Sequence, residues 1–449
     1  MSAPTLPSFK TVLKKTTSRC PVCHRACPGE VWKAGEKGTK VWLTRICPEH
    51  GSHEACISSD ARFYWLSKGD PANACGSDCA CSADPAGTTG TLGRNAGKPG
   101  TPEVLSTCLA LIEIVDSCNL ACPTCFADSP VGAAGERLKY HPLEDLKERI
   151  AGVLERKGQI EILQLSGGEP TLHPDFFELV DWIHEEPRID YCLLNTNGLR
   201  VANDPGFLDG LGERARRGSF QLYLQYDGPQ EAGQKALRGT DLRTMKSEVM
   251  DCCEREAIPF TLAMTVNRDN LPHLWETVEV GLQYELCRGV AFQPMFGSGR
   301  GGDEADRLNT ADIILSVVSQ ATERLRFEDF TPLPCGDPNC ATIGYLIRTP
   351  VGTRSVSDFI DFASVQGFLR DKVRYDLADL IKCGCENTEL GDLLHRFEME
   401  EKNAFRLFIK PFMDSWTWDE DRIDRCCTHV IRPDGKLDSF CRYYGTSPA

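Results

Sequence analysis

Apolar runs and amphipathic stretches alternate through the middle of the chain. Two of the amphipathic stretches, Leu143–Glu155 and Phe176–Glu185, repeat apolar residues at helical spacing. This alternation predicts an α/β fold built on a parallel sheet, and six repeats fit a partial (βα)6 barrel of the TIM type best. The six predicted strands are Leu109–Val115, Ile160–Ser166, Tyr191–Thr196, Phe220–Tyr226, Phe260–Val266 and Gly289–Gln293.

Polar side chains gather where these predicted strands end. In parallel α/β folds the carboxyl ends of the strands meet at one edge of the sheet, and the site lies there. Each of these residues could instead cap the helix that follows it, but the set as a whole predicts one cavity mouth. Its members are Asn195, Asn197, Gln225, Asp227, Asn267 and Gln293.

The N-terminal region has a different pattern, in which two cysteine-containing knuckles bracket a short apolar β-hairpin. The knuckles are CPVC at 20–23 and CPEH at 47–50. Paired knuckles are typical of zinc-ribbon or rubredoxin-like sites, where the ion stabilises a segment too small for its own core. We predict one mononuclear Zn or Fe, with His50 favoured over Cys27 or Cys56 as the fourth ligand. The predicted ligands are Cys20, Cys23, Cys47 and His50.

Charge and hydropathy exclude several classes of protein. The formal net charge is −15 over 449 residues, and no basic stripe that could bind nucleic acid is present. No apolar run approaches the roughly 20 residues of a membrane span, and the N-terminus lacks the apolar core of a signal peptide. We expect a soluble, cytoplasmic protein with no transmembrane segment and no nucleic-acid partner.

Cysteine usage favours metal ligation over disulfides. The chain has 23 cysteines and no predicted export signal. Most of them fall into groups with ligand spacing. Four lie inside predicted strands or helices and are expected to be small core residues: Cys192, Cys252, Cys253 and Cys287.

A dense group of cysteines follows the first predicted strand. Cys118, Cys122 and Cys125 have the spacing CxxxCxxC, and an aromatic residue, Phe126, comes next. A [4Fe–4S] cluster has four irons, so three thiolates on one loop leave the fourth iron open to another ligand. The alternative is a tetrahedral zinc site or a set of buried free thiols.

A second motif, SGGEPT at 166–171, ends the next predicted strand. Gly167 and Gly168 allow a ligand to approach the backbone, and Glu169, followed by Pro170, supplies an acceptor for an ammonium group. Because this motif lies one βα unit after the cysteine loop, the cluster is favoured over zinc.

The two motifs together resemble the signature of the radical S-adenosylmethionine (SAM) enzymes. The resemblance implies that a catalytic [4Fe–4S] cluster on Cys118, Cys122 and Cys125 binds the amino and carboxylate groups of SAM through its open iron. It also implies that the GGEP turn binds the SAM amino group. The polar strand-end residues would then line the cavity for the SAM ribose, its carboxylate and the substrate.

Further motifs resemble one subgroup, that of the archaeal tetraether lipid synthase and pterin methyltransferase-like proteins. They include CPEHG at 47–51, LQYDGP at 224–229 and CCTHVIRPDG at 426–435. Members of this subgroup carry a mononuclear metal site and three [4Fe–4S] clusters, which agrees with the grouping of the cysteines. The resemblance therefore implies two auxiliary clusters beside the catalytic one.

Two other cysteine groups supply candidate ligands for these auxiliary clusters. The first precedes a Gly/Thr/Ala/Pro-rich insertion, and its spacing departs by one residue from that usual in the subgroup; a second zinc site is the alternative. Its ligands would be Cys75, Cys79, Cys81 and Cys108. The second group would be gathered by folding from Cys335, Cys340, one or both of Cys426 and Cys427, and Cys441, while Cys383 and Cys385 are unassigned.

The sequence predicts four segments and one function. The segments are a ribbon module at 1–70, an auxiliary-cluster segment at 71–107, the radical SAM partial barrel at 108–300 and a C-terminal auxiliary-cluster (SPASM-like) domain at 301–449. The resemblance implies reductive SAM cleavage to a 5′-deoxyadenosyl radical, with electrons from a partner such as ferredoxin or flavodoxin. We predict C–C bond formation or alkylation at an unactivated position of a small-molecule or lipid substrate.

Two alternative functions stay open at this point. The first is radical transfer of the 3-amino-3-carboxypropyl group of SAM to a small acceptor. The second is a non-catalytic iron–sulfur electron carrier.

Overall fold

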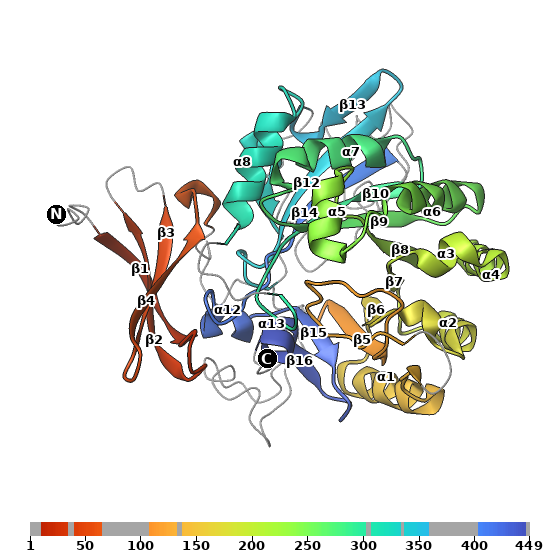
Figure 1. Cartoon of the computed structure of the whole chain (residues 1–449), viewed down its shortest axis with the longest axis horizontal. Coiled ribbons are helices and arrows are strands. Elements are labelled where there is room, and N and C mark those ends of the chain that lie inside the picture. Colours follow the sequence, from red (N-terminus) through yellow and green to blue (C-terminus); the bar gives the residue numbers. More distant parts are fainter. Residues whose placement is uncertain are drawn as a thin grey trace.

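The computed structural model describes residues 10–34, 40–64, 107–132, 137–301, 307–333, 336–358 and 403–445 (Figure 1). Six of the predicted cysteines lie outside these ranges: Cys75, Cys79, Cys81, Cys335, Cys383 and Cys385. Within the described ranges, no helix has the length and apolar character needed to cross a membrane.

Six parallel strands form the centre of a 12-stranded sheet, and they neighbour one another in chain order. The sheet stays open and does not close on itself, which confirms the predicted partial barrel. The strands are β5 (Leu109–Val115), β6 (Ile162–Gly167), β7 (Cys192–Thr196), β8 (Phe220–Gln225), β9 (Phe260–Val266) and β10 (Cys287–Pro294).

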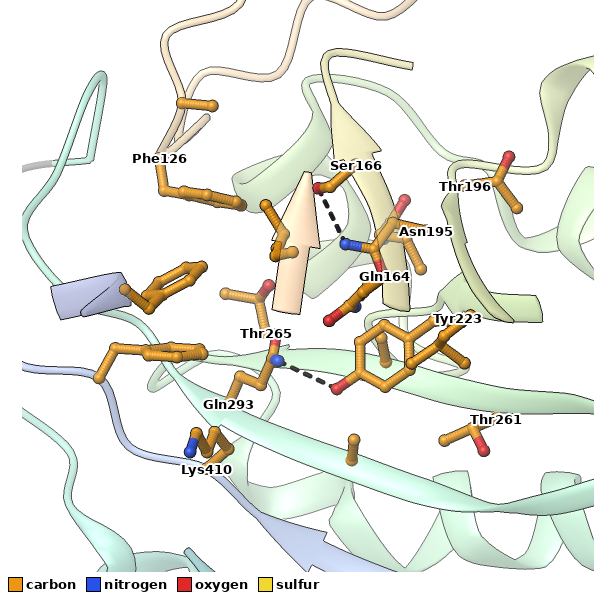
Figure 2. Close-up of a pocket in the computed structure, with 18 of the residues that line it drawn as sticks. Phe126, Gln164, Ser166, Asn195, Thr196, Tyr223, Thr261, Thr265, Gln293 and Lys410 are labelled. Carbon is orange, nitrogen blue, oxygen red and sulfur yellow. Dashed lines mark hydrogen bonds between the residues drawn. The ribbon is translucent and has the colours of Figure 1, made fainter. Parts of the chain in front are cut away.

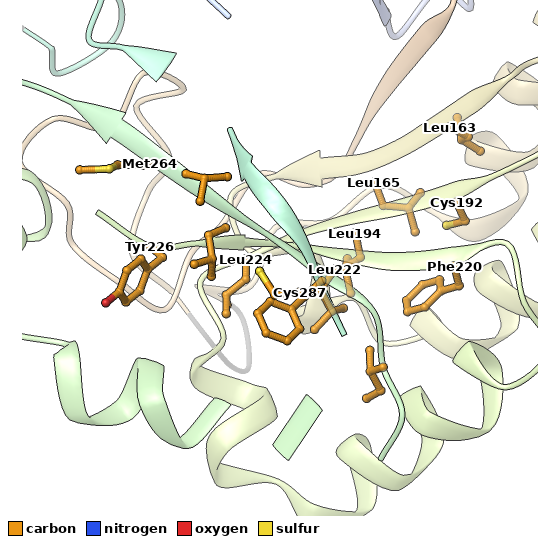
Figure 3. Close-up of a cluster of buried hydrophobic side chains, with 14 of the residues drawn as sticks. Leu163, Leu165, Cys192, Leu194, Phe220, Leu222, Leu224, Tyr226, Met264 and Cys287 are labelled. Carbon is orange, nitrogen blue, oxygen red and sulfur yellow. The ribbon is translucent and has the colours of Figure 1, made fainter. Parts of the chain in front are cut away.

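Helices cover the outer face of this sheet (Figure 1). Leu165, Leu194 and Leu222 point outward and are fully buried with the helices in one large apolar core (Figure 3). Cys192, Cys253 and Cys287 belong to the same core, as predicted, and Cys252 packs at its edge. The helices are α1 (Leu143–Lys157), α2 (Phe176–Glu185), α3 (Leu199–Asn203), α4 (Pro205–Ala215), α5 (Glu231–Arg238), α6 (Arg243–Arg255), α7 (Leu274–Leu282) and α8 (Thr310–Gln320).

The inner face of the sheet is chemically different from the outer face. Successive side chains of a strand point to opposite faces, and in β8 the residues Gln221, Tyr223 and Gln225 face inward while Leu222 and Leu224 face outward. The same alternation holds in β6, β7 and β9. We call the space that the inward residues surround the lumen.

Strands from the C-terminal third extend the sheet at both ends. The outer strands β5 and β10 would otherwise have unpaired edges, and the parallel strands β15 (Thr428–Ile431) and β14 (Ala404–Ile409) pair with them. The predicted boundary at residue 300 therefore runs through one continuous sheet. The remaining elements are β11 (Thr331–Pro332), β12 (Thr342–Thr349), β13 (Gly352–Ser355), β16 (Leu437–Ser439), α12 (Glu420–Asp424) and α13 (Phe440–Gly445).

The N-terminal region forms a separate four-stranded antiparallel sheet rather than a single hairpin. Its first strand is rich in Lys and Thr, so its sequence lacks an apolar pattern. Its strands are β1 (Lys10–Arg19), β2 (Ala26–Ala34), β3 (Val41–Cys47) and β4 (Gly51–Ser58).

This ribbon sheet packs against the C-terminal part of the chain near α12 (Figure 1). Lys14 forms an ion pair with Asp419 at 2.6 Å, and Thr16 donates a hydrogen bond to the same carboxylate at 2.6 Å. The fully buried Arg45 donates to the carbonyl oxygen of Trp416 at 2.5 Å. These contacts fix the ribbon against the C-terminal region.

Candidate active site

The cysteine loop that follows β5 forms one wall of a cavity with a volume of about 350 Å³. Cys118, Cys122 and Cys125 all line this cavity. Burial raises the pKa of Cys118 to about 12, and it also raises that of Cys122. Such thiols are poor acids and bases at neutral pH, but a metal can displace their protons. Three sulfur donors on one loop fit an iron–sulfur cluster.

The glycine pair of SGGEPT supports this loop through its backbone. The amide of Gly168 donates to the Val115 carbonyl at 2.6 Å, and the amide of Glu169 donates to the Ser117 carbonyl at 3.0 Å. A Cβ atom on Gly168 would lie 2.1 Å from the Ser117 oxygen, and one on Gly167 would lie 2.1 Å from the Val115 oxygen. The close approach to the cysteine loop therefore requires glycine at both positions.

Glu169 is buried, and its carboxylate joins the ends of two strands. It accepts hydrogen bonds from the hydroxyls of Thr171 at 2.6 Å and Thr196 at 2.7 Å, and from the amide of Asn197 at 2.8 Å. Burial raises the pKa of Glu169, and these bonds partly offset that rise. The structure thus gives the carboxylate an anchoring role, while its predicted contact with the SAM ammonium stays a prediction.

Two other segments hold the cysteine loop from the opposite side. The Thr124 hydroxyl donates to the carbonyl of Leu237 at 3.0 Å, and the amide of Arg300 donates to the Cys125 carbonyl at 2.9 Å. Gly299 has φ +54°, and a Cβ atom there would lie 2.4 Å from the Cys125 oxygen. The loop is therefore fixed by chain segments that are far apart in sequence.

A buried charged network lies behind the loop. The Arg238 guanidinium forms two hydrogen bonds with the Asp227 carboxylate, at 2.6 and 3.0 Å, and it lowers the pKa of Cys122 in opposition to the effect of burial. The Lys246 ammonium donates to the Asn197 carbonyl at 2.5 Å and to Gln225 at 3.0 Å. Burial lowers the pKa of Lys246 to about 7. This network places the Arg238 guanidinium and the Lys246 side chain close to the cysteine loop.

The strands β6 to β10 give the lumen neutral hydrogen-bonding groups (Figure 2). Asn195 donates to Ser166 at 3.0 Å, and Gln293 donates to the Tyr223 hydroxyl at 3.0 Å. Amides and hydroxyls both donate and accept hydrogen bonds, so this surface suits a polar but uncharged ligand. Other members of this surface are Gln164, Tyr191, Gln221, Thr261 and Thr265.

The ribbon carries a second, more compact site. The ligand atoms of Cys20, Cys23, Cys47 and His50 all lie within 4.8 Å of one another, and the Cys23 and Cys47 sulfurs are 3.8 Å apart. A tetrahedral Zn with bonds of about 2.3 Å would separate two sulfurs by about 3.8 Å. Burial opposes ionisation of Cys47, but hydrogen bonds from Glu49 and His50 lower its pKa to about 6. The four residues therefore fit a closed tetrahedral metal site.

Two known families match the parts of the chain that contain these two sites. The "Radical SAM superfamily" matches residues 112–280, which contain the cysteine loop, the glycine turn and five of the six central strands. The chain is a radical SAM enzyme. The "HMPTM N-terminal zinc ribbon domain" matches residues 12–59, which contain the ribbon ligands. The non-catalytic electron carrier considered above is therefore wrong, and the family implies SAM and a [4Fe–4S] cluster as cofactors.

Several relatives of this radical SAM enzyme are known. It is 25% identical to 7,8-dihydro-6-hydroxymethylpterin dimethyltransferase of Methanocaldococcus jannaschii, over 96% of this chain and 93% of that protein. It is 28% identical to GTP 3′,8-cyclase of Syntrophomonas wolfei over 47% of this chain and 62% of that protein. It is 32% identical to PqqA peptide cyclase of Ruegeria pomeroyi over 49% of this chain and 58% of that protein. The last two relatives are thus matched over less than two thirds of their length.

Solved structures give a weaker comparison. Streptococcus suis SuiB bound to S-adenosylmethionine aligns with a TM-score of 0.37 at 16% identity, covering 48% of this chain and 44% of that chain.

Not all the predicted cofactor-binding residues of this radical SAM enzyme reach the lumen. Asn195, Asn197, Gln225 and Gln293 line it together with Gly167, Gly168 and Glu169. Asp227 is fully buried behind Arg238, and the Asn267 side chain accepts from the amides of Asp269 and Asn270 within its own turn. Pro170 begins the short 3₁₀ helix 170–172. Asp227 and Asn267 thus lie outside the lining of the lumen, because each satisfies local structure, and their predicted role in cofactor binding stays a prediction.

Sequence reasoning missed several residues of the lumen and of the network behind it. The prediction considered only residues at strand ends, so it left out Gln164 and Tyr223, which lie within strands. Polar residues at every second position of a strand would have indicated both. Arg238 and Lys246 lie on helices and had no local signal. Lys410 directly follows β14, a strand that the sequence did not reveal.

The C-terminal cysteines of this radical SAM enzyme that the structure describes are Cys340, Cys426, Cys427 and Cys441, and all four are buried. Cys340 lies in one segment of the chain, and Cys426 and Cys427 lie in a second. Folding adds Cys441 from α13. Cys108 precedes β5, and its amide donates to the Cys427 carbonyl at 2.9 Å. Because Cys108 is disulfide-bonded in this structure, its role as a cluster ligand stays a prediction.

Proposed function

We propose that this enzyme uses the 5′-deoxyadenosyl radical to alkylate a small heterocyclic substrate held in the lumen. One electron from a reductant enters SAM, the bond between sulfur and the 5′-carbon breaks, and methionine and the 5′-carbon radical form. That radical takes a hydrogen atom from a substrate C–H bond, which gives 5′-deoxyadenosine and a substrate carbon radical. The new C–C bond is then made at that carbon with the methyl group of a second SAM molecule, and a second electron from the reductant leaves S-adenosylhomocysteine as the other product.

The residues have distinct proposed roles. Cys118, Cys122 and Cys125 would hold the cluster that supplies the reductive chemistry. The glycine turn would bind SAM through its backbone, with Asn195 and Gln225 lining the adjoining cavity. A ferredoxin or flavodoxin would deliver the electron, and two auxiliary clusters and the ribbon Zn or Fe would complete the metal content.

The observation that carries the substrate class is the band of neutral hydrogen-bonding groups that β6 to β10 give to an otherwise largely apolar lumen. A phosphate or carboxylate would need a cation on this wall, but these strands supply none to the lumen. Arg238 is paired with Asp227, and Arg406 and Lys410 lie on the C-terminal wall.

Each amide nitrogen of Gln164, Asn195 and Gln293 donates one hydrogen bond within the wall. An acyl chain would leave their second N–H groups without partners, which costs about 1–3 kcal/mol for each buried group. A flat heterocycle offers both apolar faces and hydrogen-bonding edges.

Similarity to the pterin dimethyltransferase favours a reduced pterin among such heterocycles. That relative matches this chain over nearly its full length, and the lining residues described above suit the donor and acceptor edge of a pterin ring. We therefore propose methylation of a reduced pterin as the specific reaction. This choice is favoured over a lipid substrate by the amide and hydroxyl groups that β6 to β10 present beside the apolar side chains of the lumen.

The test is an anaerobic reaction of enzyme, SAM and dithionite with and without reduced 6-hydroxymethylpterin. We expect 5′-deoxyadenosine in both, with several-fold stimulation by the pterin and a methylated product detected by mass spectrometry. Gln293→Leu should raise the KM for the pterin and spare uncoupled cleavage. Gln283→Leu, at an exposed position on the outside of the sheet, is the matched control and should change neither.

The other possible outcomes of this test distinguish the remaining candidate functions. Methylthioadenosine in place of 5′-deoxyadenosine would support transfer of the 3-amino-3-carboxypropyl group instead. Release of 5′-deoxyadenosine that no pterin stimulates or alters would overturn the substrate class and leave the radical chemistry standing.

A further inference from the structure

A buried ammonium group, that of Lys410, lies between the lumen and the C-terminal cysteines. Lys410 is 8% exposed and lines the lumen directly after β14 (Figure 2). Its Nζ donates to the hydroxyl of Thr428 at 3.0 Å and lies 5.9 Å from the centre of the Phe412 ring. Neither contact supplies a negative charge, and a buried cation without one is strongly destabilising.

The residue that Lys410 contacts belongs to the cysteine segment. The amide of Thr428 lies 3.4 Å from the Cys426 sulfur, and the Cys426 thiol donates to the Thr428 carbonyl at 3.1 Å. The neighbouring Cys427 lines the lumen itself. Cys426, Cys441 and Cys340 do not line it.

The charge balance around Lys410 depends on these cysteines. The Thr428 hydroxyl that holds the ammonium belongs to the residue against the Cys426 sulfur, and Cys427 lines the same cavity as Lys410. The thiols can therefore balance the ammonium when a bound metal has removed their protons.

A second cation near this group, Arg422, is already neutralised. Its guanidinium lies 3.7 Å from the Cys340 sulfur, but it also pairs with Asp337, at 3.7 Å, and donates to the Asn339 carbonyl at 2.8 Å. The described contacts of Lys410, in comparison, include no carboxylate. The charge of Lys410 is thus available to the metal group and to the lumen.

We propose that Lys410 is a positioning residue that raises the reduction potential of an iron–sulfur cluster held by the C-terminal cysteines. Four buried sulfurs fit such a cluster. One electron added to the cluster increases its negative charge, and a cation fixed beside it in a low dielectric stabilises that reduced form. This inference concerns the electron path and is independent of the substrate proposed above.

The position of Lys410 also gives the effect a direction. The ammonium lies on the lumen side of the cysteines, because Lys410 and Cys427 line the lumen while Cys340, Cys426 and Cys441 do not. A raised potential there keeps the cluster reduced at the wall nearest the substrate. Lys410 would then help to end each turnover, because the reduced cluster can supply one electron to a radical in the lumen.

The test is a redox titration of the reconstituted full-length enzyme followed by electron paramagnetic resonance. The catalytic cluster is identified because addition of SAM changes its spectrum. In Lys410→Met we expect one of the other signals to be harder to reduce, with at least a tenfold fall in its reduced-to-oxidised ratio at the wild-type midpoint, or about 59 mV for one electron. Lys410→Arg, which keeps the charge, should stay within threefold of wild type.

Thr428→Val is the second variant, because it removes the hydroxyl that holds the ammonium and keeps the charge. It should shift the same signal in the same direction by a smaller factor. An unchanged midpoint in Lys410→Met with full iron content would overturn the proposal, as would an equal shift of every cluster. If Lys410→Met fails to retain iron, Thr428→Val decides, and an unchanged midpoint there overturns the proposal.

Discussion

The ribbon site and the cysteine loop are both built from closely spaced cysteines, but they differ in geometry. The four ribbon ligands converge within 4.8 Å of one another around a single point. The three loop cysteines instead line the wall of a cavity of about 350 Å³ that they share with a glycine turn and a polar lumen. A closed tetrahedral set serves structure, whereas an incomplete set beside a cavity leaves room for a ligand.

The two sites also differ in how the rest of the chain supports them. The ribbon ligands come from two knuckles joined by strands β2 and β3, so local structure nearly suffices. The cysteine loop is held by backbone bonds from Gly168, Glu169 and Arg300 and by Thr124 bonding to Leu237. A reactive site thus needs support from several distant segments, because its geometry must stay fixed while one side is open.

The largest expected effect comes from removing the three loop thiols. The triple variant Cys118→Ala, Cys122→Ala, Cys125→Ala should lose SAM cleavage completely, because no ligands remain for the catalytic cluster. Its ribbon metal should stay bound, since those ligands lie in another sheet. Product assay by chromatography and metal analysis check both statements, and residual cleavage at the wild-type rate would show that the active cluster lies elsewhere.

The next effect tests the glycine turn. Gly168→Ala places a Cβ atom 2.1 Å from the Ser117 oxygen, so the cysteine loop must move, and we expect at least a tenfold loss of SAM cleavage with reduced cluster content. Gly152→Ala in α1 is the control, because its Cβ would meet only the flexible end of Arg156 at 3.1 Å. Equal iron content and activity in the two variants would contradict the steric argument.

A moderate effect is expected at the ribbon. Cys20→Ala removes one ligand of the closed site, so the free energy of metal binding no longer supports folding. Thermal stability and soluble yield should fall, while SAM cleavage per folded molecule is retained. Differential scanning calorimetry and a cleavage assay on the soluble fraction measure the two. A stable variant without turnover would instead make the ribbon ion a participant in the chemistry.

The smallest effect concerns the contact between the ribbon and the C-terminal region. Lys14→Met leaves the buried Asp419 carboxylate without its cation, and the expected loss is roughly 1–3 kcal/mol of unfolding free energy. Lys10→Met is the control, because the Lys10 ion pair with Glu30 is exposed and such pairs contribute about 0–1 kcal/mol. Denaturant titration of the two variants measures both losses of unfolding free energy. Equal effects would mean that the ribbon does not depend on this contact.

The sequence by itself determined the class of fold and the family. Six apolar strands at regular spacing require a parallel sheet, and CxxxCxxC followed by SGGEPT identifies the catalytic loop, because these are local patterns. The ribbon knuckles at Cys20 and Cys47 were recognisable for the same reason. Local spacing within a few residues is enough to place ligands on one loop or on two facing turns.

Tertiary structure alone decided how the distant parts meet. It satisfied Asp227 and Asn267 within local structure, brought Arg238 behind Cys122, and placed β14 and β15 beside the central strands. It also put Lys410 between the lumen and the C-terminal cysteines. Several of these contacts join residues that are more than a hundred positions apart, as in the pairing of β5 with β15. They depend on which sheet edges are free and which charges must be buried together, and no local pattern in the sequence encodes that.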